Sequence, residues 1–177
     1  MLDVFASTGG FSVHAAAGRA RSVHAVDLSA PTLAAAEHNM ALNRDRPAVA
    51  ACRFTTEVGD AFDVLTRLGR TGASYDVVVV DPPSFAARQR DVERALRAYG
   101  RLTRLALGVV RPGGVLVQAS CSARVPADRF YRAVLDAAAS AGVRLLEIAR
   151  TGHDTDHPAT FPEAAYLKAG FWTARRG

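Results

Sequence analysis

The apolar and polar positions along the chain follow two alternating patterns. Short apolar runs predict strands, and longer stretches with helical spacing between them predict helices. The strands are expected at Leu2–Phe5, Ser22–Asp27, Arg53–Val58, Asp76–Asp81, Val115–Ser120, Leu145–Ala149 and Tyr166–Thr173. The helices are expected at Phe11–Ala17, Pro31–Asn43, Ala61–Leu68, Val92–Val110 and Ala127–Ala141. This alternation is typical of a parallel sheet with helices on both faces.

The ends of several segments carry signals of their own. Ser29 stands before Pro31, which pairs an N-cap with an early proline, and Gly142 follows the last helix where a C′ glycine is expected. The valines of residues 77–80 predict a strand buried on both faces. No helix is expected between the last two strands, which favours an antiparallel pair at a sheet edge. We therefore expect a Rossmann-like α/β fold with a mostly parallel seven-stranded sheet and an antiparallel edge strand.

Composition narrows the class of protein. The 177 residues are 49% apolar, which predicts a single globular domain over residues 1–177. No apolar run approaches the roughly 20 residues that span a bilayer, and the first residues do not resemble a signal peptide, so we expect a cytoplasmic protein. Cys52 and Cys121 form no CxxC pair, so neither a zinc site nor a redox pair is expected. The net charge of +5 fits a phosphate-bearing partner, although GC-rich coding explains the many arginines equally well.

The loop of residues 3–11, DVFASTGGF, joins the first strand to the first helix. Its glycines allow tight turns, and the helix that follows offers free N–H groups, but the spacing matches neither GxGxxG nor a Walker loop. Asp27, Asp60 and Asp81 stand at or just after the ends of three successive strands, and such ends line one crevice of an open parallel sheet. We expect Asp27 to bind ribose hydroxyls and Asp60 to reach an adenine amino group. Each aspartate alone could equally be a helix cap or a turn residue.

Cys121 directly follows the apolar run that predicts the fifth strand. If the fourth and fifth strands are neighbours, roughly 5 Å apart, Cys121 and Asp81 can face the same substrate. A free cysteine is most often a small buried apolar residue, but a position between two serines at a strand end favours a nucleophile. Cys52 has no such setting and is interpreted as structural, as are His14 and His24.

Four motifs carry a family resemblance: FASTGGF, DPPSF, Ser120-Cys121-Ser122, and a tail with Asp156-His157-Pro158 followed by Tyr166-Leu167-Lys168. In this order they resemble class I S-adenosylmethionine methyltransferases, and more closely the large-subunit ribosomal RNA cytosine-5 methyltransferase family. The resemblance covers essentially the whole chain. It implies S-adenosylmethionine as the cofactor, bound by Phe5, Ala6, Ser7, Thr8, Gly9, Asp27, Leu28, Asp60, Ala61 and Asp81.

The resemblance also implies a reaction, the transfer of a methyl group to C5 of a cytosine in ribosomal RNA, with 23S RNA as the expected partner. In that chemistry Cys121 is the nucleophile that adds to C6, so a lowered pKa is expected for its thiol. Asp81 would hold the amino edge and N3 of the base. Further substrate contacts are expected from Pro82, Pro83, Phe85, Arg124 and His157. His157 and Lys168 would support the base pocket, although a turn residue and a surface charge are equally compatible with the pattern.

Two departures from the family pattern leave alternatives open. Family members carry an N-terminal PUA RNA-binding domain and a linking β segment, and we expect this chain to lack both. Ser84 stands where some members have a lysine, which removes a phosphate contact. An enzyme that methylates guanine or an exocyclic amine would need no cysteine at position 121. A non-catalytic RNA- or nucleotide-binding remnant is a further alternative, and a homodimer is compatible with the sequence.

Overall fold

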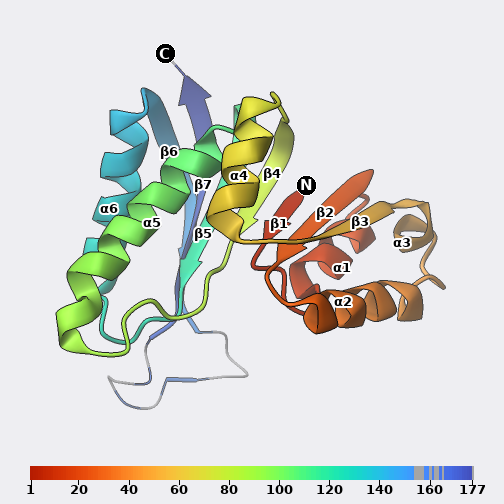
Figure 1. Cartoon of the computed structure of the whole chain (residues 1–177), viewed down its shortest axis with the longest axis horizontal. Coiled ribbons are helices and arrows are strands. Elements are labelled where there is room, and N and C mark those ends of the chain that lie inside the picture. The colour runs from red at the N-terminus through yellow and green to blue at the C-terminus, as the bar shows by residue number, and fades with distance from the viewer. Residues whose placement is uncertain (154–157, 160, 162–163, 165, 177) are drawn as a thin grey trace.

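The computed structural model describes residues 1–153, 158, 159, 161, 164 and 166–176. A seven-stranded sheet forms its centre (Figure 1). The strands are β1 (Leu2–Val4), β2 (Ser22–Asp27), β3 (Arg53–Val58), β4 (Tyr75–Val80), β5 (Val110–Ser120), β6 (Val143–Thr151) and β7 (Lys168–Arg176). Their order across the sheet is β3-β2-β1-β4-β5-β7-β6. The predicted fold class is therefore confirmed.

Most of the sheet is parallel. The pairs β1–β2, β1–β4, β2–β3 and β4–β5 run in parallel, whereas β7 runs antiparallel to both β5 and β6. The expected antiparallel pair at the end of the chain is thus present, with β7 one strand in from the edge. Val78, Val79 and Val80 of β4 are buried, as the valines of residues 77–80 predict.

Helices cover the sheet on two sides (Figure 1). They are α1 (Gly10–Ala17), α2 (Ala30–Leu42), α3 (Pro47–Ala51), α4 (Ala61–Arg70), α5 (Val92–Leu107) and α6 (Ala127–Ser140), with a short 3₁₀ turn at Gln89–Asp91. Apolar residues of α4, α5 and α6 form one continuous core with the sheet, and α1, α2 and α3 pack against the opposite side. Helix α3 was not predicted, because five residues are too few to show a helical period.

The helix boundaries follow the local signals. Ser29 caps α2 by accepting a hydrogen bond from the backbone N–H of Thr32, and Gly142 after α6 has a left-handed φ of 69°. The expected helix from Val92 to Val110 ends earlier, at Leu107. Gly108 terminates it, and Val110 already pairs with Tyr75 as the first residue of β5.

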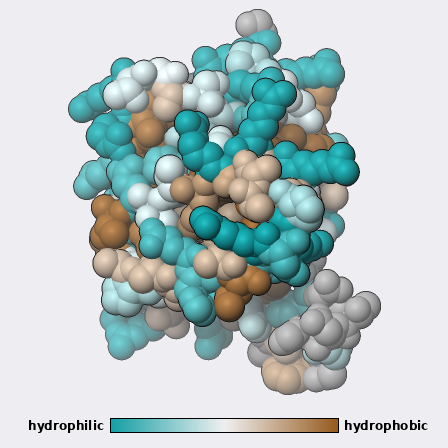
Figure 2. All heavy atoms as spheres, turned by 90° about the vertical axis from the view of Figure 1, so that its right-hand side faces the viewer, coloured by the Kyte–Doolittle hydropathy of each residue, from teal (hydrophilic) through white to brown (hydrophobic). Residues whose placement is uncertain are grey.

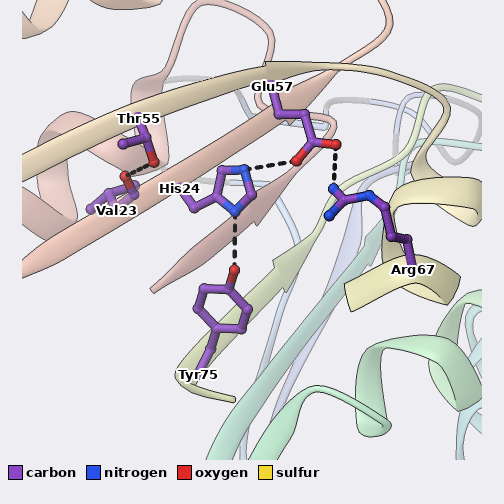
Figure 3. Close-up of polar contacts among 6 residues, drawn as sticks. All are labelled: Val23, His24, Thr55, Glu57, Arg67 and Tyr75. Atoms are coloured by element: carbon purple, nitrogen blue, oxygen red, sulfur yellow. Dashed lines mark hydrogen bonds and ion pairs between the residues drawn. The ribbon is translucent and has the colours of Figure 1, made fainter. Parts of the chain in front are cut away.

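A chain of polar contacts links strands β2, β3 and β4 and helix α4 (Figure 3). The His24 ring contacts the Tyr75 hydroxyl at 3.0 Å and a carboxylate oxygen of Glu57 at 3.2 Å, and Arg67 pairs with the other Glu57 oxygen. Burial lowers the pKa of His24, although Glu57 acts in the opposite direction. His24 thus joins strands β2, β3 and β4 through contacts of its two ring nitrogens.

The face beside β3 and α2 is mostly hydrophilic, and its apolar groups are scattered (Figure 2). Within the described residues, no helix is both long and apolar enough to cross a bilayer. The sheet offers a place for a ligand where its parallel strands end. The chain order reverses between β1 and β4, so the loops after these strands diverge and leave a crevice at their carboxyl ends.

Candidate active site

A cavity of about 520 Å³ opens in this crevice. It is formed by the loops after β1, β2, β3, β4 and β5, together with one residue that precedes β7. Its lining consists of Phe5, Ser7, Val26, Asp27, Leu28, Gly59, Asp60, Ala61, Asp81, Pro82, Pro83, Cys121 and Leu167. The structure therefore brings the three strand-end aspartates and Cys121 to one cavity, as the sequence predicted. Val26, Gly59 and Leu167 were not foreseen.

The loop after β1 is shaped by left-handed backbone angles. Phe5, Ser7 and Gly9 have φ values of 64°, 48° and 78°. Phe5 and Ser7 thereby reach the cavity, whereas Ala6 is buried and donates its N–H to the Val26 carbonyl. Position 9 requires glycine for two reasons. Its positive φ would strain any other residue, and an added Cβ would lie 2.8 Å from the Cβ of Ala36.

Three expected cofactor-binding positions of this loop lie outside the cavity lining. Ala6 and Gly9 are buried on the side of the loop that faces the protein interior. Thr8 is exposed, and its carbonyl oxygen accepts a hydrogen bond of 2.9 Å from the Asn39 side chain. These three residues determine the path of the loop, whereas Phe5 and Ser7 line the cavity.

Asp27 holds two loops together. One carboxylate oxygen accepts a hydrogen bond of 2.9 Å from the Ser7 backbone, and the other accepts one of 2.9 Å from the Ser29 backbone. A carboxylate offers about four acceptor positions, so these bonds leave capacity for a ligand hydroxyl. Leu28, which follows, is 72% exposed at the cavity and offers an apolar surface to a flat ring. Together these groups fit the ribose and the base of a nucleoside.

Asp60 is a helix cap as well as a cavity residue. One carboxylate oxygen accepts hydrogen bonds from the backbone N–H groups of Phe62, at 2.8 Å, and Asp63, at 3.2 Å. This is the capping alternative that the sequence left open. Since both bonds use the same oxygen, the second oxygen of Asp60 can still accept a hydrogen bond within the cavity.

Asp81 and Cys121 share the other end of the cavity. Strands β4 and β5 are parallel neighbours, as the argument from sequence required, and the Cys121 sulfur lies 3.9 Å from the Pro82 carbonyl oxygen. Burial raises the pKa of Asp81. Burial also raises the pKa of Cys121, the Asp81 charge raises it further, and Lys168 acts in the opposite direction. The expected lowering of the Cys121 pKa is therefore wrong, because burial and Asp81 outweigh the nearby cation.

The serines on either side of Cys121 are fully buried and fix the turn that presents it. The Tyr99 hydroxyl contacts the hydroxyl of Ser120 at 2.8 Å and that of Ser122 at 2.9 Å. Ser122 also contacts the Ser84 hydroxyl and accepts a hydrogen bond from the Phe85 backbone, both at 3.1 Å. The loop after β4 and the turn after β5 thus share one anchor. The sequence did not single out Tyr99, because its place in α5 has the same spacing as the apolar core residues of that helix.

The remaining expected substrate residues are placed as follows. The Phe85 ring packs on Tyr99 with 5.2 Å between centroids and lies outside the cavity lining, because the Ser122 contact turns this part of the loop inward. Arg124 is exposed, also outside the lining. His157 lies outside the described residues. Lys168, in contrast, is buried beside Cys121.

Asp3 is a buried carboxyl beneath the loop after β1 that the sequence did not single out. It accepts a 2.6 Å hydrogen bond from the Ser12 hydroxyl, while its other oxygen has no partner among the described residues. Burial raises its pKa to about 6. No group of three or more His, Cys, Asp or Glu side chains in the described part of the chain is arranged to hold a metal ion.

The sequence profile of the S-adenosylmethionine-dependent methyltransferases matches residues 1–172. The chain belongs to this family. Its members take their methyl group from S-adenosylmethionine, and the cavity described above, with an acidic residue for a ribose beside an apolar surface, fits that cofactor.

Two curated relatives are ribosomal RNA methyltransferases. The ribosomal RNA large subunit methyltransferase of Deinococcus radiodurans is 44% identical over 171 residues, which is 97% of this chain and 41% of the relative. The ribosomal RNA large subunit methyltransferase I of Shewanella amazonensis is 38% identical over 170 residues, which is 95% of this chain and 42% of the relative. The chain thus spans about two fifths of the length of these relatives.

Solved structures share the fold at low sequence identity. A Streptococcus mutans protein described as a S-adenosylmethionine-dependent methyltransferase has a TM-score of 0.78 at 22% identity, over 97% of this chain and 43% of that one. NSun6 from Pyrococcus horikoshii, solved with SFG, has a TM-score of 0.66 at 20% identity, over 98% of this chain and 46% of that one.

Proposed function

We propose that this methyltransferase transfers a methyl group to C5 of a cytosine in large-subunit ribosomal RNA, with Cys121 as a covalent nucleophile. The observation that carries the proposal is that Cys121 and Asp81 line one cavity, each directly after the carboxyl end of one of two neighbouring parallel strands. The names of the Deinococcus radiodurans and Shewanella amazonensis relatives support a ribosomal RNA partner. Such a partner implies that the protein acts in the cytoplasm.

The cofactor end of the cavity lies between the loops after β1, β2 and β3. Asp27 accepts hydrogen bonds from the ribose hydroxyls, and Asp60 accepts one from the adenine amino group with the oxygen that does not cap α4. Phe5, Ser7, Leu28 and Ala61 complete the walls of this part. Ala6, Thr8 and Gly9 contribute by fixing the path of the loop. Bound here, S-adenosylmethionine supplies an electrophilic methyl group.

Cys121 and Asp81, at the substrate end of the cavity, are groups suited to C5 chemistry. Carbon C5 of cytosine is a poor nucleophile until a group adds to C6. The Cys121 thiol loses its proton to solvent, and its sulfur forms a bond to C6 as the C5–C6 double bond is lost. Asp81 donates its proton to N3, so the ring is neutralised while the electron pair becomes available at C5. Burial raises the pKa of Asp81, so this carboxylate takes up the proton that it passes to N3 more readily than an exposed aspartate would.

The ring is then restored. C5 bonds to the methyl carbon, whose bond to the sulfonium sulfur breaks. Asp81 takes back the N3 proton, and the C5 proton then passes to solvent as the C5–C6 double bond forms again and the S–C6 bond breaks, which returns the thiolate to Cys121. Pro82 and Pro83 form an apolar wall beside these two residues, against which a base can pack. Arg124, exposed near the turn of Cys121, and His157 are the proposed contacts to the RNA around the target base.

The test is methylation of large-subunit ribosomal RNA transcripts, followed by digestion and mass analysis of the nucleosides. The account predicts 5-methylcytidine as the product. Cys121→Ala should lower the rate at least about a hundredfold, because the nucleophile is lost. Cys52→Ala is the matched control, since Cys52 lies outside the cavity and packs near α3, and it should keep most of the activity.

Two other results would overturn the proposal. A methylated guanine or exocyclic amine, formed as well by Cys121→Ala as by the unchanged protein, would show a reaction without covalent catalysis. Failure to bind S-adenosylmethionine in calorimetry at millimolar cofactor would show a non-catalytic remnant.

A further inference from the structure

Lys168 is the only lysine of the chain, and the residue is only 5% exposed. It is the first residue of β7 and pairs with Ser120 of β5, so its backbone lies directly beside the turn that carries Cys121. The ammonium nitrogen donates a hydrogen bond of 2.7 Å to the Ser122 carbonyl oxygen and one of 3.0 Å to that of Tyr166. A lysine head group is rarely buried unless it has a specific partner.

The two carbonyl oxygens explain how the ammonium is held, but they are neutral groups. None of the ion pairs among the described residues includes Lys168. A buried cation is costly unless an anion lies nearby, and the Cys121 thiolate would be such an anion. The proximity acts in both directions: Lys168 lowers the pKa of Cys121, and Cys121 raises the pKa of Lys168, although burial has the larger effect on each.

We propose that Lys168 is the positioning residue of the nucleophile: held by two backbone carbonyls, its ammonium fixes the Ser122 side of the turn and stabilises the Cys121 thiolate. This inference rests on the proposed role of Cys121. The charged groups that act on the thiol from packed elements are Asp81 after β4 and Lys168 of β7, while Tyr99 of α5 holds the serines on either side of it. Lys168 is the one cation among them. It therefore opposes both the negative charge of Asp81 and the burial of the sulfur.

The chain is well suited to a test without RNA or cofactor. In a Cys52→Ala background, the rate of alkylation by iodoacetamide between pH 6 and pH 10 reports the pKa of Cys121 alone. Lys168→Met should raise that pKa by about one unit and so slow alkylation at pH 7.5 roughly tenfold. Lys168→Gln, which keeps a hydrogen-bonding head group without the charge, should behave like Lys168→Met. Lys168→Arg should restore most of the rate.

The control is Arg132→Met, which removes one positive charge from an exposed position of α6 and should leave the alkylation profile unchanged. An unchanged profile in folded Lys168→Met protein would overturn the proposal. If Lys168→Met does not fold, the reciprocal measurement replaces it. Labelling with ¹⁵N-lysine gives a single side-chain signal, whose pKa should fall in Cys121→Ala, and no change would overturn the proposal. Because neither measurement depends on methyl transfer, a failure here is distinct from a failure of the proposed function.

Discussion

The phenolic oxygen of Tyr99 lies 2.9 Å from the hydroxyl oxygen of Ser122, and this contact ties helix α5 to the turn that presents Cys121. Ser120 contacts the same phenol from the other side of the cysteine. The two serines are buried while the cysteine between them lines the cavity. The tripeptide thus works as a unit in which the serines hold the backbone and the thiol is left free for chemistry.

Tyr99→Phe removes this anchor with little change of volume. We expect the free energy of unfolding to fall by about 1–3 kcal/mol, because two buried serine hydroxyls lose a partner. Urea unfolding measures the change. Tyr131→Phe is the matched control, since its hydroxyl makes one longer hydrogen bond, of 3.3 Å, to the Ala169 carbonyl. Equal losses in the two variants would show that the Tyr99 contacts have no special importance.

Asp27→Ala should weaken cofactor binding. The substitution leaves the Ser7 and Ser29 backbone N–H groups without their partner and removes the proposed acceptor for the ribose. Loss of hydrogen bonds to a charged group costs about 1.5–3 kcal/mol, so we expect the dissociation constant for S-adenosylhomocysteine to rise about ten- to a hundredfold in calorimetry. Asp45→Ala, at an exposed turn outside the cavity, should bind as the unchanged protein does. Unchanged affinity in Asp27→Ala would remove Asp27 from the cofactor site.

Asp81→Asn should separate thiol reactivity from catalysis. The negative charge of Asp81 raises the pKa of Cys121, so its removal should lower that pKa and speed alkylation at pH 7.5, the reverse of the effect expected for Lys168→Met. Methyl transfer should nevertheless fall, because asparagine cannot pass a proton to N3. Asp76→Asn, at the exposed start of the same strand, is the control for both readouts. Slower alkylation in Asp81→Asn would contradict this electrostatic account.

Asp3 makes stability depend on pH. Burial raises its pKa from 3.8 to about 6, so the folded protein favours the protonated form. Below pH 3.8 the Asp3 carboxyl is protonated in both the folded and the unfolded protein, so its raised pKa does not change the free energy of unfolding. Between pH 4 and 6 the unfolded chain releases the proton first, and stability falls as pH rises, by up to about 3 kcal/mol. Asp3→Asn should remove this loss and so stabilise the protein at pH 7.5 more than at pH 4.5 in urea unfolding. An equal effect at both pH values would contradict the assignment.

The fold and the gathering of three aspartates at one cavity could be predicted from sequence because their signals are local. The valines of residues 77–80 predict a buried strand, and a parallel sheet then brings Asp27, Asp60 and Asp81 to one edge whatever the details of packing. The same logic placed Cys121 opposite Asp81. Each of these inferences needs only the order of strands and the positions where they end.

What escaped prediction depends on contacts between distant segments. The raised pKa of Cys121 follows from burial and from the charge of Asp81. No residue next to Cys121 in sequence indicates that its pKa is raised rather than lowered. The inward turn of Phe85 follows from a hydrogen bond to Ser122, 37 residues away. Tyr99 looks like any aromatic residue on the apolar side of a helix until α5 is packed against β5.

The most direct test of the central claim is to trap the covalent step. RNA that carries 5-fluorocytidine at the target position should be methylated once and then remain bound, because fluorine at C5 cannot leave as a proton does. The account predicts a covalent protein–RNA complex that resists denaturation, with the nucleotide on the peptide that contains Cys121 and no such complex for Cys121→Ser. Methylation of cytosine in the unmodified RNA together with no adduct at Cys121 in the fluorinated RNA would contradict the account.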